Sequence, residues 1–326
     1  MVKAIVLISG GLDSILTYKI LEREGLDLIG IQFINPISSR DTESSKVVFE
    51  KNKINYIQRS DFHAFVDMLK NPRYGYGKFL NPCIDCRLLR IRLAAGMMKE
   101  FSADFIATGE VLNQRPKSQL LNALEIIEKE SGIHGLILRP LSAKHLPVTI
   151  PEEKGWVKRE NLYGIKGRSR DIQLKLAEEF GITEFHSASG GCPLAETEYA
   201  QKLKDLMNFN LMDEENIILL NIGRHFRISP RLKMIIGRNH EENLKLIESA
   251  GKVNGYLIIA EKLKGPVGLL VGSPDNEDVK LSAGLLGAYF NEEKIDFIFK
   301  KPDQSEEKIS INSLTREDLN KYRIIR

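Results

Sequence analysis

The 326-residue sequence is poor in cysteine, in tryptophan and in long apolar runs, and it carries little excess charge. Its three cysteines are too few, and odd in number, for a disulfide scaffold, so we expect free thiols in a reducing compartment. No run approaches the roughly 20 apolar residues of a membrane span, and the first, Ala4 to Ile8, is shorter than a secretory core of about 7–15 residues. We therefore expect a cytoplasmic protein with no membrane partner. The net charge is only +3, so any nucleic acid would be bound by local basic patches.

The composition is that of a folded protein, with 42% apolar and 28% charged residues, and the length predicts two domains at about 150 residues each. A strand at Ala4–Ile8, a helix at Ser14–Glu24 and a strand at Leu28–Phe33 predict a parallel α/β sheet in residues 1–210. Residues 211–326 show short apolar runs typical of a smaller α+β module. The runs expected to be strands there are Ile217–Ile222, Lys233–Gly237, Tyr256–Ala260 and Val267–Val271.

A glycine-rich turn joins the first strand to the first helix, with the sequence Ser9-Gly10-Gly11-Leu12-Asp13-Ser14. Free backbone N–H groups and the positive end of the helix dipole favour a bound anion at such a place. The spacing matches neither the kinase-type GxxxxGK[ST] loop nor the dinucleotide-binding GxGxxG turn. It therefore indicates a different kind of phosphate site, unless the turn only ends a strand and caps a helix.

This hexapeptide resembles the SGGxDS signature of the PP-loop ATP pyrophosphatases. The resemblance implies an adenine-nucleotide α-hydrolase-like sheet that cleaves ATP between its α- and β-phosphates and transfers AMP to a substrate oxygen. By the same resemblance Ser9, Gly10, Gly11 and Ser14 hold the pyrophosphate, and Asp13 places the nucleotide and its Mg²⁺ as a catalytic residue. The other residues assigned to the nucleotide site are Phe33, Thr108 and Gly109.

Two of the cysteines form a CxxC pair, Cys83 and Cys86, at the start of an expected helix, where the helix dipole is expected to lower the thiol pKa. Cys192 follows Gly190-Gly191, in a loop that could carry a distant thiol to the pair. The segment NPCIDC resembles the NPCxxC element of tRNA 2-thiouridylases, and Thr108-Gly109-Glu110 begins a stretch similar to one in tRNA 4-thiouridine synthetases. The chain thus resembles the tRNA-thiolating branch of the PP-loop superfamily over about residues 1–200.

Three assignments remain open for the thiols. In the first, Cys83, Cys86 and Cys192 are metal ligands that hold a [4Fe-4S] cluster with one iron open to hydrosulfide. In the second, Cys192 carries a persulfide that Cys83 resolves, and Cys86 takes no part. In the third, zinc is bound with His186 as the fourth ligand, and the site is only structural. The resemblance favours the cluster, with Cys83 and Cys192 catalytic.

Two stretches are rich in basic residues and suggest contact with RNA. From Lys154 to Lys175 there are seven Lys or Arg against two acidic residues, with Trp156 and Tyr163 between them. From Asn221 to His240 there are five Arg or Lys and no acidic residue. The phrase Gly237-Arg238-Asn239 within it resembles part of a small RNA-binding module of ribosome-associated quality-control factors.

These patterns predict an ATP-dependent tRNA uridine thiolase, with tRNA and a sulfur donor as partners. The donor could be sulfide, a cysteine desulfurase or a sulfur carrier, and the resemblance implies a homodimer. The alternatives are desulfuration of thiouracil or thiouridine at a three-cysteine cluster, which needs no ATP, and a non-catalytic RNA-binding protein with a decayed nucleotide site. The sequence does not specify which uridine, or which of its carbonyls, would be thiolated.

Overall fold

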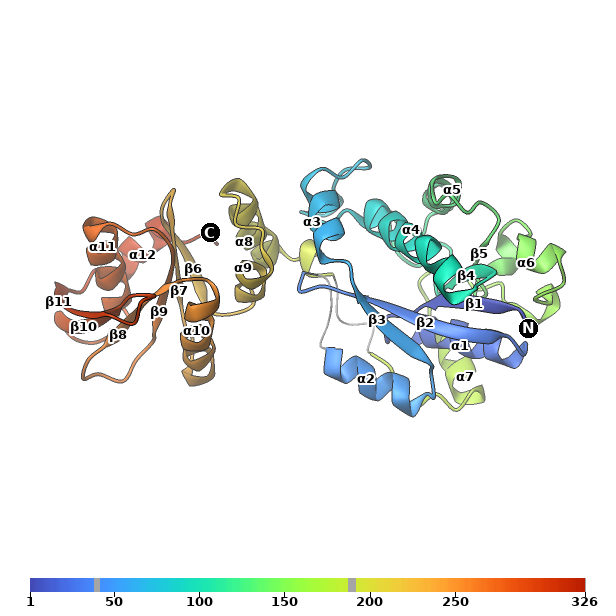
Figure 1. Cartoon of the computed structure of the whole chain (residues 1–326), viewed down its shortest axis with the longest axis horizontal. Helices are drawn as coiled ribbons and strands as arrows, with labels where there is room; N and C mark the ends of the chain where they lie inside the picture. The colour runs from blue at the N-terminus through green and yellow to red at the C-terminus, as the bar shows by residue number, and fades with distance from the viewer. Residues whose placement is uncertain (38–41, 187–191, 326) are drawn as a thin grey trace. The chain divides into compact units, whose positions relative to one another are not determined.

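The computed structural model describes residues 1–37, 42–186 and 192–325, which form two compact units (Figure 1). The first unit is Met1–Ala195 and the second is Glu196–Arg326. The chain therefore divides earlier than the boundary expected at residue 210. The reason is α8 (Thr197–Asn208), whose Asp205 carboxylate accepts hydrogen bonds of 3.0 and 2.5 Å from Arg227, on a strand of the second unit.

The first unit is built on a five-stranded parallel sheet in the order β3-β2-β1-β4-β5. In its centre Ile5 of β1 lies between Ile29 of β2 and Ile106 of β4. The expected α/β class is confirmed, and the predicted strands are found within one or two residues of their predicted ends. The strands are β1 (Lys3–Leu7), β2 (Asp27–Ile34), β3 (Tyr56–Ser60), β4 (Phe105–Thr108) and β5 (Ile137–Leu138).

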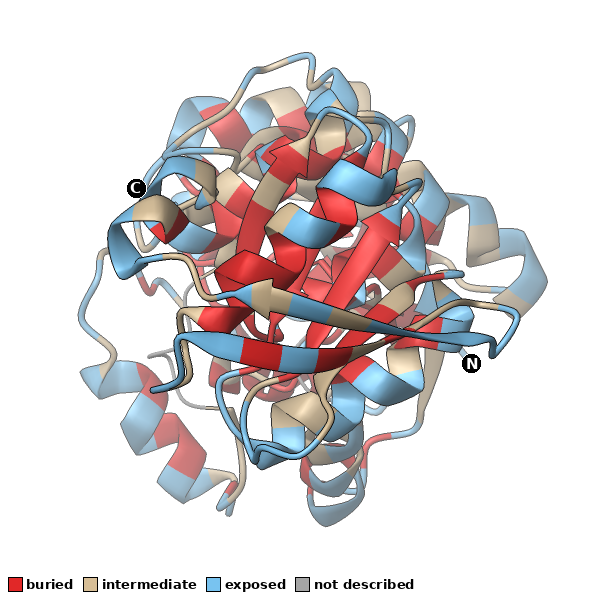
Figure 2. Cartoon of the chain, turned by 90° about the vertical axis from the view of Figure 1, so that its left-hand side faces the viewer, coloured by how far each residue is buried: buried red, intermediate tan, exposed pale blue. Residues whose placement is uncertain are grey.

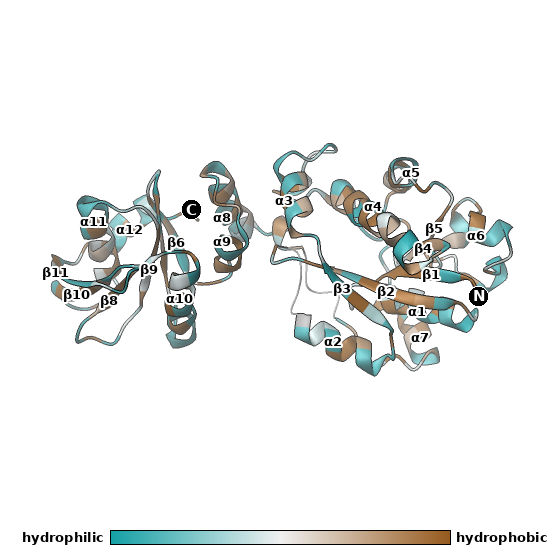
Figure 3. Cartoon of the chain, in the orientation of Figure 1, coloured by the Kyte–Doolittle hydropathy of each residue, from teal (hydrophilic) through white to brown (hydrophobic). Residues whose placement is uncertain are grey.

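Helices cover both faces of this sheet because the central strands are apolar on both sides. Ala4 and Val6 pack on the face covered by α1, α2 and α7, whereas Ile5 packs on the face of α4. Figure 3 shows the central strands in brown between helices of mixed hydropathy. The helices are α1 (Leu12–Arg23), α2 (Thr42–Lys51), α3 (Phe62–Lys70), α4 (Cys83–Phe101), α5 (Leu121–Glu130), α6 (Ile150–Glu153) and α7 (Asp171–Glu179), with short 3-10 turns η1 (Ala143–His145), η2 (Arg159–Asn161) and η3 (Pro193–Ala195).

The second unit has a six-stranded antiparallel sheet in the order β11-β10-β8-β9-β7-β6, which confirms the expected α+β module. Figure 2 shows its buried residues on the inner strands and exposed residues along the β10 and β11 edge. One face packs against α9 and α10, and the other against α11 and α12. The elements are α9 (Glu214–Leu219), β6 (Arg224–Ser229), β7 (Leu232–Ile236), α10 (His240–Lys252), β8 (Tyr256–Ala260), β9 (Gly268–Gly272), α11 (Asn276–Gly287), β10 (Lys294–Lys300), β11 (Glu306–Asn312) and α12 (Arg316–Tyr322).

One expected strand of this unit is wrong. The run Ile217–Ile222 overlaps α9 rather than a strand. Asp213 caps this helix by accepting a hydrogen bond from the backbone N–H of Asn216, and a cap of this kind starts a helix whatever the β propensity of the following isoleucines. Within the described ranges, no helix combines the length and apolarity needed to cross a membrane.

A lysine lies almost fully buried under α8. The side chain of Lys233 on β7 is 1% exposed, and its Nζ lies 3.7 Å from Asp205. Burial lowers the pKa of Lys233 to about 7, although the Asp205 carboxylate opposes this. Between pH 7 and the usual value of 10.5, the unfolded chain therefore binds a proton that the folded chain does not.

The sign of this effect gives a prediction. The stability of the second unit should rise with pH from about 7 to 10.5, and Lys233→Met should remove that dependence while Arg227 still pairs with Asp205. We expect the Met variant to unfold roughly 3–8 °C higher than the parent at pH 6, with the gap closing toward pH 10. Thermal unfolding followed by circular dichroism at both pH values measures this, and a gap that does not change with pH would contradict it.

Candidate functional site

The glycine-rich loop lies at the carboxyl end of β1 and runs directly into α1. Gly11 is the N-cap of α1, and no side chain caps the helix. Gly10 has a φ of +74°, and a Cβ there would lie 2.6 Å from Nε2 of His186. Ser14 fixes the turn by donating a hydrogen bond of 2.7 Å to the Gly11 carbonyl and accepting one of 3.2 Å from the Ser9 N–H. The loop thus presents an uncapped helix N-terminus, which favours an anion.

The Asp13 carboxylate is held beside this loop by two side chains. Gln114 donates a hydrogen bond of 2.7 Å to Asp13, and Arg170 Nη2 lies 3.5 Å from its other oxygen. Gln173 in turn donates a hydrogen bond of 2.9 Å to Gln114. Nε of Arg170 and Oε1 of Gln173 are buried and have no hydrogen-bond partner within the described residues. Arg170, which lies beside Asp13, and Gln173, which lies beside Gln114, therefore each keep a buried polar atom with unused hydrogen-bonding capacity.

Sequence reasoning did not assign Arg170 or Gln173 to this site. In the sequence, Arg170 is notable only as part of the basic stretch that begins at Lys154. The sequence contains only part of the information needed to assign Arg170 to this site, namely that Arg170 directly precedes the segment that forms α7. The sequence gives no indication that this end of α7 packs against the loop.

The other residues assigned to the nucleotide lie at the carboxyl ends of neighbouring strands. Phe33 is the penultimate residue of β2 and is 9% exposed. Gly109 directly follows β4 and lies close to the glycine-rich loop. A Cβ at this position would lie 2.7 Å from the Asp13 carbonyl oxygen. The hydroxyl of Thr108 donates a hydrogen bond of 3.1 Å to Glu110. Gly109 therefore adjoins the loop, whereas the Thr108 hydroxyl is already used.

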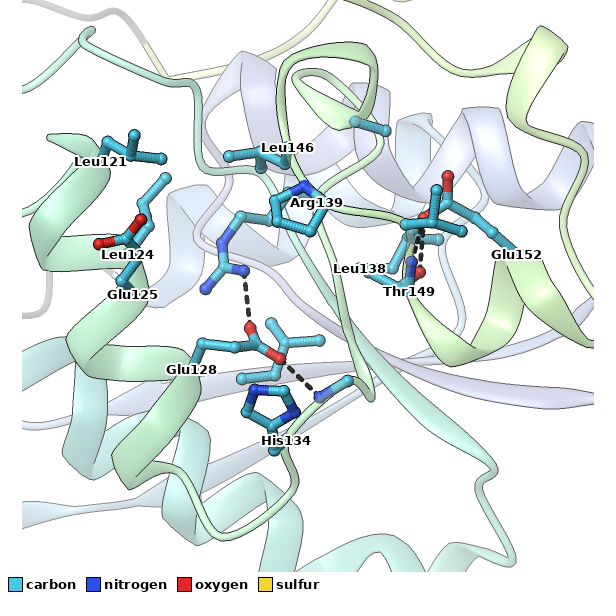
Figure 4. A pocket seen from close by; sticks show the side chains of 15 residues that line it. Leu121, Leu124, Glu125, Glu128, His134, Leu138, Arg139, Leu146, Thr149 and Glu152 are labelled. Carbon is cyan, nitrogen blue, oxygen red and sulfur yellow. Dashed lines mark hydrogen bonds and ion pairs between the residues drawn. The ribbon is translucent and has the colours of Figure 1, made fainter.

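A cavity of about 240 Å³ lies between α5 and the segment after β5, and none of its lining residues belongs to the glycine-rich loop (Figure 4). Its walls are mostly apolar, with Leu121, Leu124 and Leu146 near the guanidinium of Arg139. That group donates hydrogen bonds of 3.0 Å to both Glu110 and Glu128. Because two carboxylates already balance its charge, this cavity does not have the electrostatics of a triphosphate site.

The structure brings Cys192 to the CxxC pair. Cys83 is the first residue of α4 and donates a hydrogen bond of 2.9 Å to Asn81. The Leu80 N–H donates a hydrogen bond of 3.2 Å to the Leu194 carbonyl, which ties the segment before α4 to the segment after Cys192. All three thiols are free. Gly190 and Gly191, expected to make this loop flexible, lie outside the described residues.

The expected lowering of the thiol pKa is wrong. Burial raises the pKa of Cys83, and the charge of Cys86 adds to the rise against Arg87, Arg115 and Lys117. Burial also raises the pKa of Cys192, to about 11, with added contributions from Cys86 and Cys83. Desolvation outweighs the helix dipole because the thiols are shielded from water. The mutual effects nevertheless place the three thiols within electrostatic range of one another.

The zinc alternative needs His186 among these thiols, and the structure does not place it there. Its ring lies against Gly10, and Nε2 is 3.0 Å from the Ser45 hydroxyl. Across residues 1–37, 42–186 and 192–325, no three His, Cys, Asp or Glu side chains stand at metal-binding geometry. The donor set of Cys83, Cys86 and Cys192 suits a soft metal or iron-sulfur centre, but the thiols are not arranged as a closed site.

The basic stretches are less available to RNA than expected. Trp156 packs on the core and stacks on Phe105 with ring centroids 6.2 Å apart, and Tyr163 also packs on the core. Arg159 is held by Glu152 at 2.6 Å. In the second stretch Arg227, Arg231 and Arg238 are paired with acidic residues, and Lys233 is buried. The interpretation as a free basic surface is therefore wrong for four of the five cations of the second stretch. In the first stretch it is wrong for Arg159 and Arg170, whereas Lys154, Lys158, Lys166, Arg168 and Lys175 are exposed and form no ion pair with a described residue.

Each unit matches a known family over part of the chain. Residues 1–145 match the family described as thiamine biosynthesis protein (ThiI), and residues 223–323 match the NFACT protein RNA binding domain. The tRNA-specific 2-thiouridylase MnmA 2 of Fusobacterium nucleatum subsp. nucleatum is 27% identical over 224 residues, which are 66% of this chain and 60% of that protein. The chain thus spans about 60% of the length of this curated relative.

Two solved structures resemble the chain in part. The U34-tRNA thiolase NcsA from Methanococcus maripaludis, with its [4Fe-4S] cluster, has a TM-score of 0.37 at 20% identity and covers 67% of this chain and 70% of its own. A 4-thiouridine synthetase in complex with RNA and bound ATP has a TM-score of 0.35 at 20% identity and covers 55% and 50%.

The parallel sheet, with a glycine-rich loop after its first strand, is the α/β arrangement that the resemblance to the PP-loop proteins predicts. The family match and the curated relative confirm the more particular resemblance, to the tRNA thiolation proteins of that superfamily. The match of residues 223–323 likewise confirms the likeness of the second unit to an RNA-binding module.

Proposed function

We propose that this chain is an ATP-dependent tRNA uridine thiolase. The observation that carries the proposal is that one unit holds both the SGGLDS loop, with Asp13 fixed beside it, and three thiols drawn together from two distant segments. The thiouridylase relative and the RNA-binding match of the second unit support tRNA as the substrate.

The first chemical step belongs to the loop. Ser9, Gly10, Gly11 and Ser14 bind the pyrophosphate part of ATP, and Asp13 positions the nucleotide with its Mg²⁺. A uridine carbonyl oxygen attacks the α-phosphorus, and pyrophosphate leaves. The base must be accessible, so it is either a flexible position or is turned out of the RNA stack.

The second step replaces oxygen by sulfur. The adenylated oxygen is now part of a good leaving group, so a sulfur nucleophile at the cysteine site adds to the same carbon and AMP departs with the oxygen. When the nucleophile is hydrosulfide, its proton replaces the one that N3 of the uridine lost on adenylation, so this step releases none. The order of the steps explains why ATP is needed at all: hydroxide or oxide would be a poor leaving group.

For the sulfur site we propose Cys83, Cys86 and Cys192 as the ligands of a [4Fe-4S] cluster. Three thiolates satisfy three of the four irons, and the cluster when bound supplies a Lewis-acidic iron for an external sulfur ligand. The proposal is supported by the electrostatic influence of Cys83 and Cys86 on Cys192, which means that the three thiols lie in one neighbourhood. In the persulfide alternative, Cys192 carries the sulfur and Cys83 resolves it.

Arg170 gives a prediction about nucleotide binding. Its guanidinium lies beside Asp13 with a buried Nε that has no partner among the described residues, so it is placed to meet a phosphate oxygen. We expect Arg170→Gln to weaken ATP binding about tenfold, which corresponds to one charged hydrogen bond. Isothermal titration calorimetry with ATP and Mg²⁺ measures this directly, without turnover.

The matched control is Lys99→Gln, which removes one positive charge from an exposed position on the last turn of α4. ATP affinity should not change in this variant. Equal affinities for the parent, Arg170→Gln and Lys99→Gln would remove Arg170 from the nucleotide site.

The test of the function is release of AMP and pyrophosphate from ATP by the purified, anaerobically reconstituted protein, with and without tRNA. We expect both products to depend on tRNA. Desulfuration would proceed without ATP consumption, and a decayed site would produce no AMP under any condition, so either result would overturn the proposal.

A further inference from the structure

Among the described residues of the second unit, three arginines have no acidic partner, and they gather around one tyrosine. They are Arg224 on β6, Arg316 at the start of α12 and Arg323 just after α12. None of them forms an ion pair with any residue that the structure describes. The tyrosine is Tyr289, which follows α11 and is half-buried on the same face of the sheet.

The fold brings these residues together from three separate segments. Arg224 lies over the ring of Tyr289, with its Cζ 5.2 Å from the ring centroid. Arg323 is bridged to Phe226, two residues further along β6, and the Ile324 N–H donates a hydrogen bond of 3.1 Å to the His225 carbonyl. The end of the chain thus runs beside the strand that carries Arg224.

Arg316 enters from the opposite end of α12. Thr315 and Asp318 form a capping box there, and Asp318 is also paired with Lys321 at 2.7 Å. Burial raises the pKa of Tyr289, and the positive charges of Arg224, Arg323 and Arg316 all oppose the rise. All three guanidinium groups therefore lie within electrostatic range of a single hydroxyl, and no carboxylate contributes there.

The other arginines of this unit show why the cluster is distinctive. Arg227 is used by Asp205, Arg231 by Asp275 and Asp278, and Arg238 by Glu242. A guanidinium that already binds a carboxylate has to give it up before it can bind a phosphate, whereas an unpaired one keeps its donors available. An aromatic ring beside such donors suits a nucleotide, because the base can stack while the phosphate is bound.

We propose that Arg224, Arg316, Arg323 and Tyr289 form the RNA-backbone site of the second unit. The proposal rests on the proposed function for its substrate, tRNA, and names the residues that hold it. This cluster takes the place of the stretch Asn221–His240 as the proposed RNA contact, because the other cations of that stretch are paired or buried. Arg224 is the one member of that stretch that retains the role.

The experiment uses the full chain and an unmodified tRNA transcript, with affinity measured by filter binding between about 50 and 200 mM NaCl, where phosphate contacts respond most strongly. The test variant is Arg316→Gln with Arg323→Gln. We expect affinity to fall at least tenfold and the slope of log affinity against log salt to become shallower by about 2, one for each lost phosphate contact. Arg316→Lys with Arg323→Lys should keep most of the slope.

The matched control is Lys262→Gln with Lys264→Gln, two exposed lysines between β8 and β9 that form no ion pair in the described ranges. It removes the same charge, and we expect less than a twofold change. Equal losses in the two Gln pairs, or no loss in either, would overturn the site while leaving tRNA binding by the parent intact. A parent protein that binds no tRNA would overturn the proposed function as well. Circular dichroism spectra and melting curves verify that each variant is folded.

Discussion

Asp13→Ala is expected to reduce AMP formation by about 100-fold or more, because it removes the carboxylate that positions the nucleotide and its metal at the helix N-terminus. The fold should persist. The side chain is 16% exposed, and its carboxylate is paired with Gln114 and Arg170, so its loss removes two polar interactions rather than a part of the apolar core. Tm and AMP release with tRNA measure the two effects separately.

The matched control is Asp67→Ala, which removes an exposed carboxylate from α3. Its AMP formation should equal that of the parent. Unchanged AMP formation in Asp13→Ala would remove the glycine-rich loop from the chemistry, whereas loss of AMP formation with loss of the folded state would show a structural role for Asp13.

The second large effect concerns the cysteines. We expect Cys83→Ala, Cys86→Ala and Cys192→Ala each to abolish both the iron-sulfur absorbance of the anaerobically reconstituted protein and its thiolation of tRNA. A cluster held by three thiolates has no spare protein ligand, so the loss of any one disrupts it. Iron and sulfide analysis, visible absorbance and nucleoside analysis of the tRNA give three independent readings.

The alternatives predict different results for the same variants. A persulfide mechanism needs only Cys83 and Cys192, so Cys86→Ala would stay active and air would not inactivate the enzyme. A structural zinc site would give a loss of stability in each variant without iron absorbance. Thiolation by aerobically purified, iron-free Cys86→Ala protein would therefore contradict the cluster.

The parallel sheet could be predicted from the sequence because its strands are continuous apolar runs that alternate with helical segments. The glycine-rich loop could be predicted for a related reason, since glycines and hydroxyls occupy the short connection after the first strand. Both signals are local. The edge strand β11 and its neighbour β10 could not be predicted because exposed Lys, Glu and Asp interrupt their apolar residues.

The features that could not be predicted depend on distant parts of the chain. The stretch Asn221–His240 contains no acidic residue. Arg227 and Arg231 nevertheless form ion pairs with carboxylates in α8 and at the start of α11. The basic surroundings of Trp156 in the sequence are typical of a base-stacking residue, whereas in the fold its ring stacks on Phe105. Position relative to the helix N-terminus predicted a low thiol pKa for Cys83, whereas burial by other segments raises it.

The most direct test of the account compares two products of one reaction. The reconstituted protein, an unmodified tRNA, ATP and a sulfide source are incubated anaerobically, and AMP and thiolated uridine are quantified together, the latter by mass spectrometry of digested tRNA. Activation before substitution predicts about one thiolated uridine for each AMP released in the tRNA-dependent reaction. Thiolated uridine formed without AMP, or tRNA-dependent AMP with no thiolated nucleoside, would contradict it.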